Sequence, residues 1–294
     1  MLDIYLLIVN FPLKMFSFFA FFVGTLSLWV KKTALIWGSF FILSLALAYQ
    51  SGLIEVTALA PIVILGFLQW MLKYNLRGVA RFVVVTAAVL VSLGLWMHKF
   101  PGFHNWKIME DTLSPGAISY RLWMNFDKPW VGIFVLAFLL PLVSSWQEFR
   151  KIIKMSFPWV ALSIIVMISL GFFTGIIKYD PKLPDMAAAF MIVNFFLVAI
   201  PEEAFMRGFV QKELCDFFGK GVFLQFLGIV ATSVLFTALH VFWISDPRFL
   251  ALVFVAGIVF GGIYQYTKAI EASILAHFLF NACHFLFFTY PVLK

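Results

Sequence analysis

The sequence predicts an all-α fold, a polytopic transmembrane helical bundle of about ten spans. Of its 294 residues, 63% are hydrophobic and only 12% are charged, and the mean hydropathy is +1.01. A soluble domain carries about 25% charged residues, so this chain could not solvate its surface as a soluble domain does. Apolar runs of about 18 residues or more recur along the chain, and each is long enough to cross about 30 Å of hydrocarbon as a helix. The runs are continuous and do not alternate with period two, which argues against an outer-membrane barrel.

Short polar interruptions divide the chain into expected helices. The expected spans are residues 4–30, 33–50, 53–73, 79–97, 130–146, 158–177, 187–212, 221–243, 249–267 and 271–290. The longest interruption, 98–128, contains Pro, Gly and both acidic and basic residues. We therefore expect an N-terminal transmembrane extension of about four helices (1–97), a polar linker (98–129) and a helical core (130–294).

The basic residues are scattered between the spans, so the net charge of +7 does not indicate a nucleic-acid partner. Their distribution is typical of the loops that stay on the cytoplasmic side. The main clusters are Lys31–Lys32, Lys73/Arg77/Arg81 and Arg150/Lys151/Lys154. Cys215 and Cys283 lie far apart and predict neither a disulfide framework nor a thiolate metal site. We expect a multi-pass integral membrane protein of a bacterial inner (plasma) membrane, with the lipid bilayer as a partner and no nucleic acid.

Three charged residues interrupt the apolar stretch at 187–212. Glu202 and Glu203 are adjacent and Arg207 follows; ionisable groups inside a span are costly and mark candidate functional sites. On a helix, positions i and i+4 are neighbours, whereas i and i+1 diverge by about 100°. We therefore expect Glu203 to pair with Arg207, while Glu202 lacks that partner and suits proton transfer near neutral pH. The alternative is that both carboxylates only brace the helix. Pro201 lacks a backbone N–H and is expected to loosen the helix at this point.

Two later spans also carry polar groups. His240 ends the span at 221–243, one turn after Phe236 on the same face, and by itself is more typical of a hydrogen-bonded packing residue. In the last span, His277 and Asn281 share a polar stripe with His284 at positions i, i+4 and i+7. Each of these groups needs a partner in hydrocarbon. We therefore expect the three helices to bring their polar groups together.

The span at 249–267 carries two small residues four positions apart. Gly257 and Gly261 have the small-xxx-small spacing that lets helix backbones approach closely. Tight helix packing is therefore the main interpretation of this pair.

These residues resemble the motifs of a known family. Glu-Glu-x-x-x-Arg at 202–207, Phe-x-x-x-His at 236–240 and His-x-x-x-Asn at 277–281 are similar to those of the CPBP (CAAX protease / bacteriocin-processing) family of intramembrane proteases, which includes the type II CAAX prenyl endopeptidases. Each motif alone is weak. The specificity comes from finding all three in order, each in its own span. The resemblance covers roughly residues 150–290, so the core at 130–294 is expected to be a CPBP-like catalytic core, and nothing is implied for the first four helices.

The resemblance implies an intramembrane endopeptidase that hydrolyses a peptide bond in a membrane-associated substrate. It implies that Glu202 is the general base that activates water with assistance from His240, and that His277 and Asn281 hold water and stabilise the oxyanion. A carboxylate, imidazoles and an amide form a chemically coherent set for base, relay and electrophilic stabilisation. Structural support is expected from Glu203, Arg207 and Phe236. The implied substrate is a peptide or protein, either lipid-modified or a small precursor.

A metal-dependent mechanism is the alternative for the same residues. Glu202, His240 and His277 together would make a reasonable zinc set. However, the sequence contains no His-Glu-x-x-His motif, and the three residues come from different helices. We favour a mechanism without a cofactor, in which glutamate activates water, and keep zinc as the alternative.

Two other classes of function stay open. A proton-coupled transporter also places Glu, Arg and His inside the membrane. It would distribute polar residues along a path and often repeat its halves, whereas here the polar residues cluster in three helices and no repeat is visible. A catalytically silent immunity or scaffold protein on the same fold is the remaining alternative, and the intact motif set argues against it.

Overall fold

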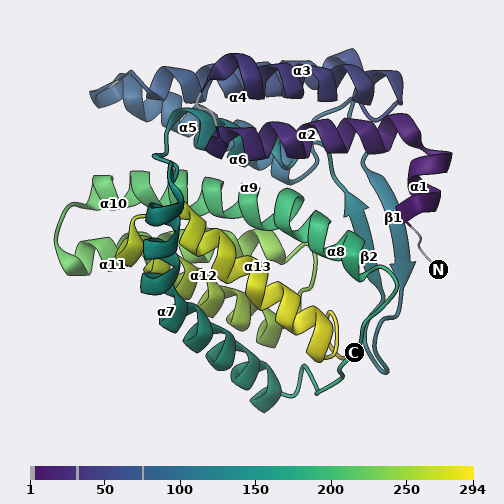
Figure 1. The fold of residues 1–294 in the computed structure, drawn as a ribbon. Helices are drawn as coiled ribbons and strands as arrows, with labels where there is room; N and C mark the ends of the chain where they lie inside the picture. Colours follow the sequence, from purple (N-terminus) through teal and green to yellow (C-terminus); the bar gives the residue numbers. More distant parts are fainter. Residues whose placement is uncertain (1–3, 31–32, 75) are drawn as a thin grey trace. The chain divides into compact units, whose positions relative to one another are not determined.

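The protein is mainly helical and its contacts form two compact units (Figure 1). The computed structural model describes residues 4–30, 33–74 and 76–294, and the basic pair Lys31–Lys32 lies outside the described residues. Unit 1 comprises Met1–Ile108, Trp123–Ser144 and Asp185–Ala204; unit 2 comprises Met109–Leu122, Ser145–Pro184 and Phe205–Lys294. This grouping records packing and does not test which part carries activity, so the boundaries expected at 97 and 129 stay a prediction.

Most of the expected spans are present as helices. Among the described residues, seven segments are long and apolar enough to cross a membrane: Pro12–Val30, Gly78–Trp96, Trp146–Phe173, Ala187–Phe218, Val222–His240, Pro247–Thr267 and Ile270–Phe287. The apolar helices Ala34–Gln50 and Val56–Leu72 are shorter and correspond to the spans expected at 33–50 and 53–73. The prediction of a polytopic helical membrane protein is confirmed.

Unit 1 contains the N-terminal helices and the first half of the segment Ala187–Phe218. Its elements are α1 (Ile4–Asn10), α2 (Pro12–Val30), α3 (Ala34–Gln50), the 3-10 turn η1 (Val56–Ala58), α4 (Leu59–Leu72), α5 (Gly78–Trp96), α6 (Trp130–Phe138), α8 (Ala187–Val193), the π-helical stretch η2 (Asn194–Ala199) and α9 (Ile200–Glu203). Helix α2 packs on α3, α4 packs on α5 and α6, and α6 packs on α9.

Helix α6 ends at Phe138 and is therefore shorter than the span expected at 130–146. Aromatic side chains surround its first residue. Trp130 is 1% exposed and its ring lies 5.2 Å from that of Phe21 and 5.4 Å from that of Phe41. In the same helix, a Cβ atom added to Gly132 would lie 2.4 Å from the Cα of Pro201. The missing side chain therefore lets α6 touch the backbone of α9.

The expected polar linker contains two short strands that the sequence did not predict. Strands β1 (Trp106–Asp111) and β2 (Tyr120–Met124) pair in a two-stranded sheet. The turn between them bonds to the end of the chain, since Ile118 N–H donates to Val292 O at 3.0 Å and Lys294 N–H donates to Gly116 O at 3.0 Å. The bonds to the end of the chain join residues that are distant in sequence, so local patterns could not predict this contact.

Unit 2 contains the long helix α7 and the C-terminal helices. Its elements are α7 (Trp146–Phe173), most of the π-helical stretch η3 (Ala204–Gln211), α10 (Lys212–Phe218), α11 (Val222–His240), α12 (Pro247–Thr267) and α13 (Ile270–Phe287). Helix α12 packs on α11, α7 and α13, and α13 also packs on α7.

The two glycines of α12 lie where neighbouring residues leave no room for a side chain. An added Cβ would lie 2.8 Å from the Cβ of Ser233 at Gly257, and 2.6 Å from Oε1 of Gln211 at Gly261. Gln211 also donates from Nε2 to the carbonyl oxygen of Gly261 at 3.0 Å. The expected close helix packing at these glycines is confirmed.

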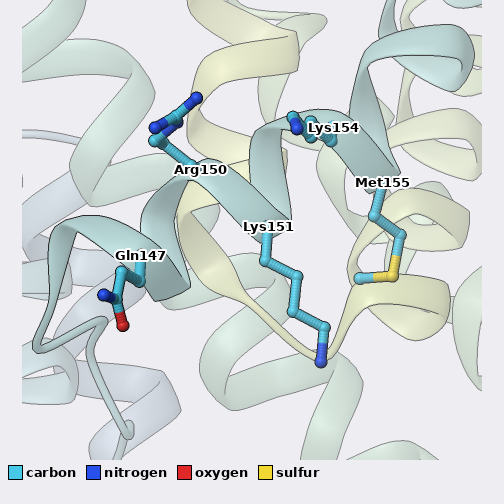
Figure 2. Close-up of a pocket in the computed structure, with 5 residues that line it drawn as sticks. All are labelled: Gln147, Arg150, Lys151, Lys154 and Met155. Carbon is cyan, nitrogen blue, oxygen red and sulfur yellow. The ribbon is translucent and has the colours of Figure 1, made fainter.

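The basic cluster at 150–154 lies on a helix and not in the expected loop. Helix α7 has 28 residues, so it is about 42 Å long and exceeds the hydrocarbon thickness of about 30 Å. Arg150, Lys151 and Lys154 occupy its first turns and, with Gln147 and Met155, line a cavity of about 610 Å³. Figure 2 shows Arg150 and Lys151 extending to different sides of the helix. This cavity contains none of the predicted site residues.

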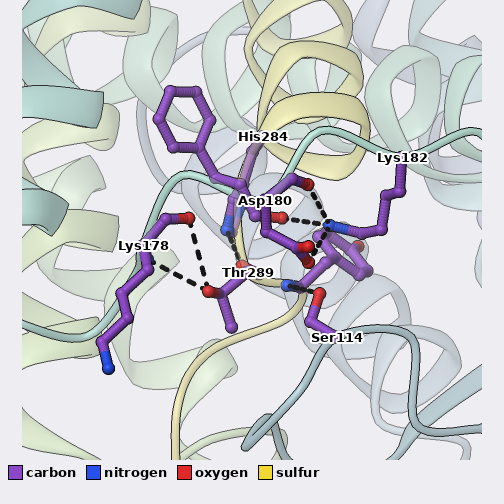
Figure 3. Close-up of polar contacts among 8 residues, drawn as sticks. Ser114, Lys178, Asp180, Lys182, His284 and Thr289 are labelled. Carbon is purple, nitrogen blue, oxygen red and sulfur yellow. Dashed lines mark hydrogen bonds and ion pairs between the residues drawn. The ribbon is translucent and has the colours of Figure 1, made fainter.

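A cluster of hydrogen bonds within unit 2 connects the end of α13 to residues 178–182 (Figure 3). Lys182 donates from Nζ to Asp180 Oδ2 at 3.0 Å and also to the carbonyl oxygen of Phe288. Thr289 N–H donates to Lys178 O at 2.9 Å. His284 donates from Nε2 to Thr289 O at 3.0 Å, which gives this histidine a structural role. The hydroxyl of Ser114 and the nearby ammonium of Lys182 hold the pKa of the Asp180 carboxyl below its ordinary value.

Replacing Gly132 by Ala should destabilise the protein, because the new methyl group would collide with backbone atoms of Pro201. We expect a loss of about 1–3 kcal/mol in the free energy of unfolding, the usual range for overpacking. Gly38→Ala is the matched control, since an added Cβ there meets nothing within 4 Å. Thermal unfolding in detergent measures both variants, and equal midpoints for the two would contradict the close approach of α6 to α9.

Acidification should weaken the Asp180 cluster. A carboxyl whose pKa is lowered in the folded state stabilises the fold above its ordinary pKa, and this contribution is lost as the pH falls. At neutral pH the free energy of unfolding of the wild type should exceed that of Asp180→Asn by less than about 1 kcal/mol. This difference should disappear as the pH drops below about 4. Unfolding midpoints between pH 7 and pH 3 test this, with Asp185→Asn as the control. A constant difference across this range would show that Asp180 does not titrate with folding.

Candidate active site

The two adjacent glutamates lie on a distorted part of the helical segment Ala187–Phe218. Helix α9 (Ile200–Glu203) is a short α-helical piece between the π-helical stretches η2 and η3. Before it, Ile200 N–H donates to Phe195 O, five residues earlier, as a π-helix requires. Pro201 has no N–H to donate, which agrees with the expected loosening of the helix. Wide π-turns inside α-helices are frequent at functional sites.

Glu202 has a cationic partner within unit 1. Lys128 donates from Nζ to Glu202 Oε1 at 2.5 Å, and the glutamate side chain is 3% exposed. The expectation that Glu202 is the carboxylate without a cation is therefore wrong. Lys128 lies 74 residues earlier in the chain, at the start of an apolar stretch, and nothing in the local sequence connects it to residue 202. Glu203 is fully buried on the same short helix.

Three predicted residues of unit 2 meet around the ring of Phe236. The Cζ atom of Arg207 lies 4.8 Å from the centre of this ring. The ring centre of His240 lies 4.5 Å away and that of His277 lies 6.2 Å away. These four residues come from η3, α11 and α13. Phe236, which was expected to support the site, thus contacts one cation and two imidazoles.

The orientation of His240 is determined by its own helix. Its Nδ1–H donates to the carbonyl oxygen of Phe236 at 2.7 Å, one turn earlier. When one ring nitrogen of a neutral imidazole is the donor, the other carries the lone pair. Nε2 of His240 is therefore the nitrogen that can accept a proton. The side chain is half-buried near the end of α11.

His277 and Asn281 follow each other by one turn on α13. His277 is 5% exposed, and its ring stacks on that of Phe260 with 5.1 Å between the centres. Asn281 is half-buried. The two residues thus offer an imidazole and an amide on adjacent turns of one helix, in agreement with the expected polar stripe.

The predicted site residues fall into two groups. Glu202 and Glu203 belong to unit 1, and the remaining residues belong to unit 2. The latter are Arg207, Phe236, His240, His277 and Asn281. The pairing of Glu203 with Arg207 and the grouping of Glu202 with the histidines both stay predictions.

Metal binding was the open alternative for these residues. Within the described part of the chain, no group of three or more His, Cys, Asp or Glu side chains is arranged to hold a metal ion. The set of Glu202, His240 and His277 stays an alternative that direct metal measurement tests.

One part of the chain matches a known protein family. Residues 184–283 match the family described as "Type II CAAX prenyl endopeptidase Rce1-like". This match covers about a third of the chain and includes every predicted site residue. No curated protein and no solved structure matches the chain. Residues 184–283 are therefore similar to the type II CAAX prenyl endopeptidases, which agrees with the resemblance to the CAAX-protease and bacteriocin-processing (CPBP) family.

Proposed function

We propose that this protein is an intramembrane endopeptidase that cleaves a membrane-associated peptide or protein with a water molecule activated by Glu202. The observation that carries the proposal is the position of Glu202. It is a buried carboxylate on a π-distorted helix, inside the segment that matches the endopeptidase family. A charged group is costly at such a place and is retained where it has a function.

The proposed chemistry assigns one role to each polar group. Glu202 takes a proton from water, and the resulting hydroxide attacks the carbonyl carbon of the scissile bond. His277 and Asn281 donate hydrogen bonds to the oxyanion that forms on the carbonyl oxygen. His240 takes this proton from Glu202 at Nε2 and passes it to the nitrogen of the scissile bond, so that the amine leaves in neutral form as the C–N bond breaks and both side chains return to their starting states. Glu203, Arg207 and Phe236 support these residues.

The proposed location is a bacterial plasma membrane, where the substrate also resides. The family description makes a prenylated C-terminal peptide the first substrate to test. A small precursor peptide is the second. The mechanism proposed for Glu202 is the same for both, because it acts on the peptide bond and not on the lipid.

Glu202→Gln should abolish cleavage, because an amide cannot accept the proton of the attacking water. General bases contribute about 10²–10⁴-fold in rate, so we expect a loss of at least about a hundredfold. Comparing the protein termini in membranes that contain the wild type with those that contain the variant reveals the cleavage products. Glu213→Gln, the same change on α10, is the control. Unchanged termini in Glu202→Gln membranes would contradict the proposed base. Solute uptake by reconstituted vesicles that survives Glu202→Gln would favour the transporter alternative.

Removal of metal should leave the activity intact, since a glutamate-activated water needs no Lewis acid. We expect the purified protein to contain far less than one zinc ion per chain and to cleave normally after treatment with a strong chelator. Elemental analysis and a cleavage assay measure the two quantities. Stoichiometric zinc, together with activity that chelation removes and zinc restores, would support the metal-dependent alternative.

A further inference from the structure

We propose that Lys128 is a positioning residue for Glu202, and that the part of the chain outside the family match holds this lysine in place. Lys128 lies well before the matched segment 184–283. Its catalytic consequence rests on the function proposed above, whereas the ion pair itself does not. The N-terminal region, for which the family resemblance implied no role, thus holds the cation that positions Glu202.

The ammonium group of Lys128 is enclosed by two partners. Nζ contacts Glu202 Oε1 at 2.5 Å and lies 4.4 Å from the ring centre of Trp96. The lysine side chain is 14% exposed and Trp96 is 7% exposed. An ammonium over an indole ring gains a cation–π attraction that grows as water is excluded. Both contacts therefore favour a single arrangement of the lysine beside the carboxylate.

The backbone beside Lys128 is held by the buried carboxylate of Asp127, which is 1% exposed. Its Oδ2 accepts a hydrogen bond from His98 Nδ1 at 2.7 Å. Its Oδ1 accepts from Asn105 Nδ2 at 3.0 Å and from Lys128 N–H at 2.8 Å. Asn105 in turn accepts through Oδ1 from Phe126 N–H at 2.8 Å. These bonds attach residues 126–128 to the segment that follows α5.

Aromatic packing and a glycine complete the support. Phe126 is 1% exposed and its ring lies 5.5 Å from that of Phe18, while Trp130 packs on Phe21 as described above. One turn beyond Lys128, Gly132 allows α6 to touch Pro201, the residue before Glu202. Helix α6 and the turn that leads into it therefore place the close backbone contact at Pro201 and the lysine beside Glu202, the next residue.

This arrangement has a consequence for the proposed reaction. The ammonium offsets the free-energy cost of holding an ionised carboxylate away from water. A positioned base depends on the residues that lock its side chain, and small displacements reduce the rate strongly. Lys128 thus acts on the reaction through Glu202 and not by touching the substrate.

The test compares full-length variants in detergent and in membranes. The set comprises Lys128→Met, Lys128→Arg, Glu202→Gln and the double variant Lys128→Met/Glu202→Gln. Lys99→Met is the matched control, because Lys99 is an exposed lysine of the same unit. Unfolding midpoints are measured for all of them. Cleavage is measured with a quenched-fluorescence peptide that carries a farnesylated cysteine in a C-terminal Cys-a-a-X sequence, and with the Glu202-dependent termini of membrane proteins.

We expect Lys128→Met to lower the unfolding midpoint by several degrees, because it leaves a buried carboxylate without its cation. Glu202→Gln in the same chain should recover most of this loss, as expected for a directly coupled pair. Lys128→Met should lower kcat by about tenfold or more with little change in KM. Lys128→Arg keeps the charge and should restore most of the kcat. Lys99→Met should change neither quantity.

Two results would overturn the inference. Additive shifts of the unfolding midpoint in the double variant would show that Lys128 and Glu202 are not coupled. Coupled stabilities together with a wild-type kcat in Lys128→Met would show that the lysine is structural only. Failure of the proposed function gives a different result. If Glu202→Gln leaves all cleavage unchanged, Glu202 is not the base. The coupling between the unfolding midpoints of the Lys128 and Glu202 variants then still shows whether the ion pair forms.

Discussion

A carboxylate in the hydrocarbon region is stable only if a cation, hydrogen bonds or water replaces its lost hydration. Two adjacent glutamates in an apolar segment make this the dominant constraint on the protein. For Glu202, the structure shows the compensation in the form of Lys128, itself placed over Trp96. The residues around Lys128 support this contact. The hydrogen bonds of Asp127 hold the backbone beside the lysine, and Gly132 lets α6 approach the residue before Glu202.

The second group of polar residues is organised by an aromatic ring. Phe236 contacts Arg207, His240 and His277, and it also accepts through its carbonyl oxygen from His240. An apolar side chain can gather polar groups in this way because its ring face attracts cations and its bulk excludes water. Fastening the end of α13 through Asp180 and Lys182 (Figure 3) further restricts the helix that carries His277 and Asn281. Both groups thus rely on rigid support from residues that perform no chemistry.

Local patterns predicted the helices well where the apolar run is continuous. The spans expected at 221–243, 249–267 and 271–290 agree with α11, α12 and α13 to within a few residues, because about twenty apolar residues in succession form a helix in a bilayer. The span at 130–146 is only half helical, and the linker contains strands. The turn between β1 and β2 also pairs with the end of the chain, a contact between residues far apart in sequence that local patterns cannot predict.

The sequence by itself determined the membrane class, the order of the motifs and the candidate residues for the proposed chemistry, because hydropathy and helical spacing are local properties. The partner of Glu202 was decided only by tertiary structure. Helical spacing favoured Arg207 as a partner of Glu203, but it could not show that a lysine 74 residues away reaches Glu202. A charge in hydrocarbon takes whichever countercharge the fold brings to it, and sequence distance places no limit on that choice.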